Sequence, residues 1–211
     1  MTKTIVWDYN GTILDDAWLC LDIENRMLRQ RGMKSGWTLE QYRDLFCFPV
    51  KDYYYKIGYT FENESYEDIS VEFNDLYDEG FSQCHLIEGF MDKIREAQAK
   101  GYRSVIVSAS RQDKLNAQIQ ALGIENFFDE LIGIDDLLAH GKIQRALEWM
   151  KNSGTDAGEC IYIGDSTHDK ETADAMGIPV CWLVAQGHQS YNVLKKKEPV
   201  HTVHTLKEVQ L

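Results

Sequence analysis

The sequence has no excess of positive charge. It contains 22 lysines and arginines against 34 aspartates and glutamates, which gives a formal net charge of −12. Nucleic acids and anionic membranes are bound through basic surfaces, so this balance argues against both as partners. One short basic cluster, Lys195–Lys197, is interpreted as a solvated loop.

Cysteines are few and lack the spacing of a disulfide framework. Their number is odd, at five, and Cys160 and Cys181 adjoin apolar runs that we expect to be buried strands. Buried, reduced thiols are typical of a reducing compartment. No apolar run is long enough to cross a bilayer, and the first expected strand begins too close to Met1 to leave room for a signal peptide. We therefore expect a cytoplasmic protein.

Repeats, low-complexity tracts and linkers rich in Pro, Gly or Ser are also absent from the sequence. From Gly89 onward, helical and strand patterns alternate, which predicts a parallel sheet with right-handed crossovers. The expected strands span 103–107, 130–133, 159–164 and 180–184, and the expected helices span 90–100, 114–122, 143–152 and 170–176.

Before Gly89 the pattern after the first strand is helical. Apolar residues repeat at helical spacing over 17–31, and Thr38 and Ser65 begin sequences typical of helix starts. A helical block between two strands of one sheet is an insert. We therefore expect a core domain of residues 1–15 and 86–211 and a helical cap of residues 16–85.

The most informative stretch is Thr4–Asp16, with the sequence TIVWDYNGTILDD. The apolar run Ile5–Trp7 leads directly to Asp8 and then to an Asn-Gly pair, which predicts a buried strand ending in a sharp turn. Open α/β sheets place their ligands at the carboxyl ends of strands. A buried charge there is costly unless something positive is bound. Asp8 therefore either caps its own loop or holds a cation or a reacting group.

Three features follow the later strands. Ser108 closes the run SVIV and can hydrogen-bond an anion, although capping of the next helix, by Ser110 for example, explains a serine here equally well. Lys142 begins a helix, where a solvated surface lysine is the common case. Asp165 and Asp169 lie in the run IYIGDSTHD and offer the hard oxygens that Mg²⁺ prefers, or else they cap a helix.

These runs resemble the motifs of the haloacid dehalogenase-like phosphohydrolases. Asp8–Thr12, DYNGT, resembles the DxDGT signature, and Ser108–Arg111, SASR, resembles the Ser-Ala-Ser-Lys run of the β-phosphoglucomutase-like branch. Lys142 resembles the third motif, and Asp165–Asp169 resembles the GDxxxD form of the fourth. The resemblance implies a Rossmann-like α/β fold with strand order 3-2-1-4-5 and an α-helical cap inserted after the first strand, as in the phosphoglycolate phosphatase-like members.

The resemblance also implies a Mg²⁺-dependent phosphatase, a monomer or homodimer, that acts on a small phosphorylated metabolite. Asp8 would attack phosphorus and form an aspartyl-phosphate, which water would hydrolyse. The phosphoryl oxygens would be stabilised by Lys142, Ser108 and the loop around Gly11, Thr12 and Ala109. The metal would be held by Asp8, the backbone carbonyl of Asn10, Asp165 and, through a coordinated water, Asp169.

The signature departs from the family at Asn10, where a second aspartate normally protonates the leaving oxygen. Asparagine cannot supply that proton, and such help is typically worth ~10²–10⁴-fold in rate. Three outcomes stay open: a preference for good leaving groups, substitution by Asp15, Asp16 or His168, or a phosphate-binding relative with little turnover. A hexose-phosphate mutase also needs the missing aspartate and is a weaker alternative.

Aromatic residues crowd the expected cap, and a polar loop, Gln186–Gln189, follows the last expected strand. We prefer an ordinary loop to a site role for Gln186–Gln189, and we take His85 and His140 as structural. We expect most of the cap aromatics to form its core, although any of them can line a pocket. They are Phe46, Phe48, Tyr53, Tyr54, Tyr55 and Tyr59.

Overall fold

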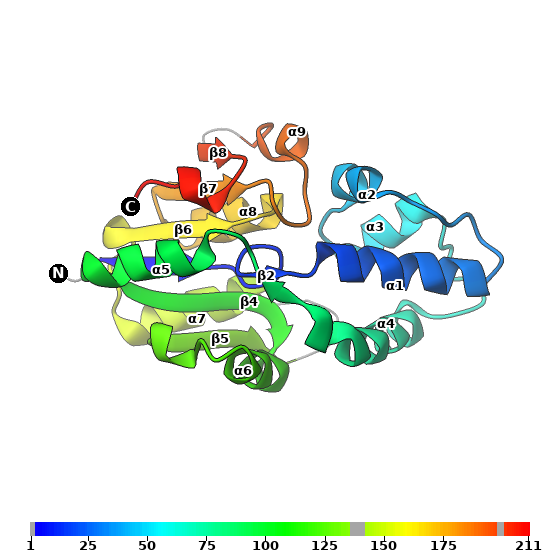
Figure 1. Cartoon of the computed structure of the whole chain (residues 1–211), viewed down its shortest axis with the longest axis horizontal. Helices are drawn as coiled ribbons and strands as arrows, with labels where there is room; N and C mark the ends of the chain where they lie inside the picture. Colours follow the sequence, from blue (N-terminus) through cyan, green and yellow to red (C-terminus); the bar gives the residue numbers. More distant parts are fainter. Residues whose placement is uncertain (1–2, 136–141, 198–200) are drawn as a thin grey trace.

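The computed structural model describes residues 3–135, 142–197 and 201–211. A six-stranded parallel sheet has the order β5-β4-β1-β6-β7-β8 (Figure 1). The predicted order of five strands is confirmed, and β8 extends it at one edge. The strands are β1 (Thr4–Trp7), β4 (Arg103–Arg111), β5 (Glu130–Ile134), β6 (Cys160–Gly164), β7 (Val180–Val184) and β8 (His201–Val203).

Helices cover both faces of this sheet. Side chains alternate along a strand, so Ile5 and Trp7 of β1 pack in the layer that contains α5 (Phe90–Ala99) and α6 (Gln112–Ala121). Val6 packs on the opposite side, in the layer of α7 (Lys142–Ser153) and α8 (Thr167–Ala175). Burial on both faces explains why these strands read as continuous apolar runs. His140 lies outside the described residues.

Four further helices form a group beyond one end of the sheet (Figure 1). They are α1 (Ala17–Gln30), α2 (Leu39–Leu45), α3 (Val50–Ile57) and α4 (Tyr66–Gly80). Thr38 and Gln41 form the capping box of α2, and the Ser65 hydroxyl accepts a hydrogen bond from the Asp68 amide at the start of α4. These helix starts are as predicted, and the group corresponds to the expected insert; the division into two domains stays a prediction.

Several elements differ from the sequence expectation. The helix that begins after Ser65, which the helical pattern predicts over about 66–84, ends at Gly80 and continues as a 3₁₀ turn, Phe81–Gln83. Gly80 packs so tightly on α1 that an added Cβ would lie 2.6 Å from Leu19 Cδ1. The strand expected to end at Ser108 runs on to Arg111, with a register irregularity against β5.

Short elements escaped the sequence analysis because they contain too few residues to show a period. Two of them, β2 (Leu14–Asp15) and β3 (His85–Leu86), pair in antiparallel fashion where the chain leaves and re-enters the sheet domain. The others are β8, α9 (Tyr191–Leu194) and the 3₁₀ turns Glu125–Phe127 and Ala157–Glu159. Near the end of the chain, where the sequence pattern allows a short helix around Leu206, the structure has a 3₁₀ turn, Leu206–Glu208.

The structure also bears on membrane-spanning helices and on the cysteines. Among the helices that the structure describes, none has both the length and the apolar character needed to cross a membrane. All five cysteines are free thiols, and four of them are buried.

Candidate active site

Asp8 lies directly after β1, on the wall of a cavity of about 210 Å³. Its amide donates to the carbonyl of Ile163 at 2.8 Å, which continues the pairing of β1 with β6 by one residue. The residue is 6% exposed. Its Oδ1 accepts a hydrogen bond from Lys142 Nζ at 2.5 Å, and its Oδ2 accepts one from Thr12 Oγ1 at 3.2 Å.

Lys142 is buried, with an exposed fraction of 3%, so it is not the solvated surface lysine that its position suggested. Its Nζ also contacts Asp169 Oδ1 at 2.6 Å. Burial raises the pKa of Asp8, the charge of Asp169 adds to this effect and Lys142 opposes it, with a net value of about 6. One cation is thus shared between two buried carboxylates, and a further positive charge would be favourable here.

Asp169 has both of the roles that the sequence left open. Its Oδ2 accepts from the Ser166 amide at 2.9 Å and from Ser166 Oγ at 2.6 Å, which forms the capping box of α8. Its Oδ1 faces Lys142. Burial acts to raise the pKa of Asp169, but Lys142 and Ser166 outweigh it, so the pKa lies below the usual value.

Asp165 ends the neighbouring strand and is also buried. Burial raises its pKa well above the usual value, and only partial compensation comes from His188, whose amide donates to Asp165 Oδ2 at 2.5 Å. Oxygens of Asp8, Asp165 and Asp169 lie within 4.8 Å of one another. This donor set fits a hard divalent cation such as Mg²⁺. Asp169 accepts hydrogen bonds from more protein donors than Asp8 or Asp165, so Asp8 and Asp165 are the freer ligands.

The predicted site residues thus converge on one place, but not all of them reach the cavity. The predicted residues that line the cavity are Asp8, Asn10, Ala109, Lys142 and Asp165. Those that do not line it are Gly11, Thr12, Ser108 and Asp169. The hydroxyl of Ser108 accepts a hydrogen bond from the Ser110 amide at 3.0 Å. Its predicted contact with phosphate stays a prediction.

Asn10 connects the sheet to the helical group. Its Nδ2 donates to Asp16 Oδ2 at 2.7 Å and to the hydroxyl of Tyr77, on α4, at 3.0 Å. Its Oδ1 accepts from Ser110 Oγ at 2.7 Å. Both ends of the amide therefore have protein partners, and the orientation of the side chain is fixed from both sides.

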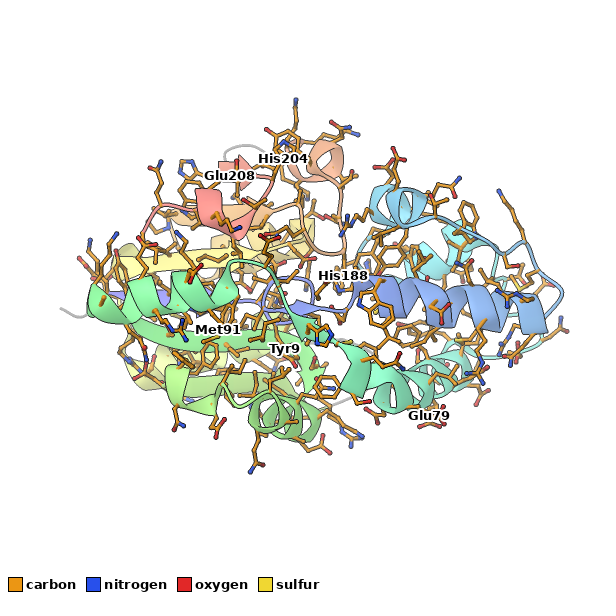
Figure 2. The ribbon with its side chains drawn as sticks, in the orientation of Figure 1. Tyr9, Glu79, Met91, His188, His204 and Glu208 are labelled. Carbon is orange, nitrogen blue, oxygen red and sulfur yellow. The ribbon has the colours of Figure 1, made fainter. Side chains whose placement is uncertain are left out.

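His188 is a site residue that the sequence analysis missed, and the preference for an ordinary loop is wrong at this position. It lines the cavity and lies where the sheet meets the helical group (Figure 2). Its Nε2 lies 3.3 Å from Asp16 Oδ1, and its Nδ1 lies 2.7 Å from the hydroxyl of Tyr42. Burial would lower the pKa of His188, but Asp16 outweighs burial and raises it to about 9. The signal in the sequence was a histidine just after the last inner strand, at the ligand-binding edge.

Of the three residues proposed to replace the missing acid, only Asp16 lines the cavity in the described part of the chain. His168 stacks on Phe48 with ring centroids 4.6 Å apart and pairs with Glu171. Burial raises the pKa of Asp15, and the neighbouring Asp16 adds to this effect.

The aromatic residues of the helical group divide between cavity and core. Phe46, Phe48 and Tyr54 line the cavity. Of the others, Tyr53 and Tyr59 are buried in the core, and Tyr55 is 51% exposed. The expectation of a core position holds for Tyr53, Tyr54 and Tyr59, and Tyr54 lines the cavity as well.

Strand-end carboxylates, a shared buried lysine and a cavity at the point where the strand order reverses are typical of a ligand-binding site in a Rossmann-type α/β sheet. Residues 5–183 match the family model of the haloacid dehalogenase-like hydrolases, and the chain belongs to this family.

Curated relatives include several phosphatases. A probable phosphatase, IndB, of Dickeya dadantii is 29% identical over 57% of this chain and 53% of its own length. A phosphoglycolate phosphatase of Mesorhizobium japonicum is 32% identical over 44% of this chain and 41% of its own. The chain thus spans about half the length of these relatives. The pyrophosphatase PpaX of Oceanobacillus iheyensis is 21% identical over 98% of this chain and 94% of its own.

Solved structures share the fold over almost the whole chain. A haloacid dehalogenase-like hydrolase from Bacteroides fragilis has a TM-score of 0.81 at 18% identity and covers 98% of both chains. A predicted phosphatase from Clostridium acetobutylicum has a TM-score of 0.80 at 17% identity, covering 99% of this chain and 96% of its own.

Proposed function

We propose that this chain is a Mg²⁺-dependent phosphatase that hydrolyses a small phosphomonoester through an aspartyl-phosphate on Asp8. The observation that carries the proposal is the position of the Asp8 carboxylate on the cavity wall, 2.5 Å from Lys142. Several relatives are named as phosphatases, which supports the same reaction class. The free thiols fit a cytoplasmic location, which we propose as well.

In the proposed reaction, a carboxylate oxygen of Asp8 forms a bond to phosphorus as the ester P–O bond breaks. Thr12 orients this carboxylate, and Lys142 offsets negative charge beside it. Water then cleaves the acyl-phosphate and frees Asp8. The cation would be held by Asp8, the backbone carbonyl of Asn10, Asp165 and, through a coordinated water, Asp169. It would neutralise negative charge on the phosphoryl oxygens.

The helical group, residues 16–85, would act as the cap that closes over the substrate. Contacts between this group and the loop after β7 support that role. Arg43 on α2 donates from Nε to the carbonyl of Gly187 at 2.7 Å, and its own carbonyl accepts from the Ser190 amide at 3.1 Å. In this arrangement both parts of the chain contribute to the cavity wall.

The second candidate is a weakly active or inactive phosphate-binding relative. It is favoured by Asn10, whose amide is held between Asp16, Tyr77 and Ser110 and can supply no proton. If turnover occurs without a replacement acid, esters with good leaving groups should react fastest, because their oxygens need no proton on departure.

Phosphate release from p-nitrophenyl phosphate and acetyl phosphate, with and without Mg²⁺, tests the proposal. We expect metal-dependent turnover that is lost in Asp8→Ala and retained in Asp22→Ala, which removes an exposed carboxylate on α1. Wild-type protein without turnover, together with a gain in Asn10→Asp, would favour the phosphate-binding alternative. Turnover that persists in Asp8→Ala would exclude Asp8 as the nucleophile.

A further inference from the structure

Among its described residues, the helical group contributes acidic but no basic side chains to the cavity wall. Asp16, Glu24 and Asp78 reach the wall from this group, whereas no lysine, arginine or histidine within its described residues does so. The remainder of that wall is largely aromatic. A second anionic group on a substrate would therefore meet like charge and apolar rings on this side of the cavity.

The cations that the sheet domain contributes to the cavity are already paired with carboxylates. The pairs are Lys142 with Asp8 and Asp169, His188 with Asp16, Lys114 with Asp78, and Arg111 with Asp113. The first two are buried. In the described part of the chain, no buried cation on the wall is free to receive a second anion.

Glu24 on α1 is a buried carboxyl group of this wall, and one of its two oxygens accepts no hydrogen bond from the described part of the chain. It is 4% exposed, and its Oε2 accepts a hydrogen bond from the hydroxyl of Tyr53. Its Oε1 has no hydrogen-bond partner among the residues that the structure describes. Because Glu24 lines the cavity, a ligand bound there can supply the hydrogen-bond donor that Oε1 lacks.

The ionisation of Glu24 follows from the same surroundings. Burial raises its pKa to about 8, against the opposing effects of Tyr53 and His188. Near neutral pH the free carboxyl group is therefore largely protonated, and a bound hydrogen-bond donor, an ammonium group above all, would favour its ionised form, in which Oε1 accepts.

We propose that the leaving group of the substrate carries no negative charge and donates a hydrogen bond, from a hydroxyl or an ammonium group, to Glu24 Oε1. This inference rests on the proposed phosphatase function. It makes Glu24 a determinant of specificity, with aromatic side chains such as Phe46, Tyr54 and Phe73 packing against the organic part. Phosphoglycolate and pyrophosphate, which the names of relatives mention, each add a second anion and should be poor substrates.

Three aryl phosphates that differ only in the para substituent test the inference: 4-(hydroxymethyl)phenyl, 4-(aminomethyl)phenyl and 4-carboxyphenyl phosphate. We expect wild-type kcat/KM to favour the hydroxymethyl or the aminomethyl ester over the carboxylate by about tenfold or more, as one buried hydrogen bond would give. Glu24→Leu should reduce this ratio to about threefold or less, mainly through KM.

Conservative and distant variants separate recognition from folding. Glu24→Gln keeps an accepting oxygen, so it should retain the hydroxymethyl preference and lose an aminomethyl preference. Glu79→Gln makes the same change at an exposed position of α4, away from the cavity, and should leave all ratios unchanged (Figure 2). Phosphoglycolate or pyrophosphate as the best substrate, or an unchanged ratio in Glu24→Leu, would overturn the inference.

If the proposed phosphatase function is wrong, p-nitrophenyl phosphate will release no phosphate, whatever the role of Glu24. In that case calorimetric binding of the same three esters to wild type and Glu24→Leu decides the question. Weaker binding of the carboxylate ester, with the difference lost in Glu24→Leu, would support the role of Glu24, and equal binding would refute it.

Discussion

Asn10 Nδ2 donates a hydrogen bond to Asp16 Oδ2 at 2.7 Å. This contact places the residue that departs from the family signature against a buried carboxylate. Asp16 is 1% exposed and also accepts from the Gly11 amide and from the hydroxyl of Tyr77. An aspartate at position 10 would place a second carboxylate next to that of Asp16, and the two negative charges would repel each other. Asparagine avoids this repulsion and donates a hydrogen bond to Asp16.

Asn10→Asp should therefore destabilise the fold while it supplies an acid. We expect a loss of about 1–3 kcal/mol in the free energy of unfolding, because a donor is replaced by a like charge. Urea unfolding measures this loss. In Asn10→Asp/Asp16→Asn the loss should be smaller than the sum of the single losses, and strict additivity would show that the two side chains are not coupled.

Lys142→Met should cost about 3–5 kcal/mol of unfolding free energy, because it leaves Asp8 and Asp169 buried without their shared cation. Lys151→Met, at an exposed position on the same helix, is the matched control. Both are compared by urea unfolding at neutral pH without added metal. Equal stability of the two variants would contradict a structural role for the buried ion pairs.

The pairing of His188 with Asp16 predicts a pH dependence of stability. The folded-state pKa of about 9 lies above the unfolded value of about 6.5, so this stabilisation is complete below about pH 6.5 and is lost as the pH rises through about 9. His188→Gln should therefore differ most from wild type near pH 6 and least above pH 9. Unfolding curves across this range, with the exposed His85→Gln as control, check the trend. A difference that grows with pH would refute the pairing.

Gly11→Ala should disturb the site as well as the backbone. Gly11 and Gly101 both have φ of +75°, which favours glycine. A Cβ at Gly11 would lie 2.3 Å from Asp165 Oδ2, whereas a Cβ at Gly101 would meet nothing within 4 Å. Both alanine variants should lose about 1 kcal/mol from backbone strain. Gly11→Ala should lose clearly more and reduce phosphate release, and equal effects would exclude a steric contact with Asp165.

The amino-acid sequence alone determined the sheet and the positions of its acidic strand ends. Apolar runs such as Ile5–Trp7, the turn residues that follow them and the helix starts at Thr38 and Ser65 act locally, so their pattern is visible without coordinates. The order of the inner strands followed from the motif resemblance. The pair of two-residue strands, β2 and β3, and the 3₁₀ turns Glu125–Phe127 and Ala157–Glu159 were missed, because they are too short to show a period.

Tertiary packing decided which other side chains share the cavity wall with Asp8. Asp16 and Glu24 come from the start and the middle of α1, Tyr77 from α4 and His188 from the loop after β7, and no local pattern in the sequence shows that these segments meet. They converge because the helical group lies against the ligand-binding edge of the sheet. The same packing buries Lys142, which the motif resemblance placed at the site but which its position at a helix start alone would leave in solvent, since burial is a property of the surrounding elements and not of the residue itself.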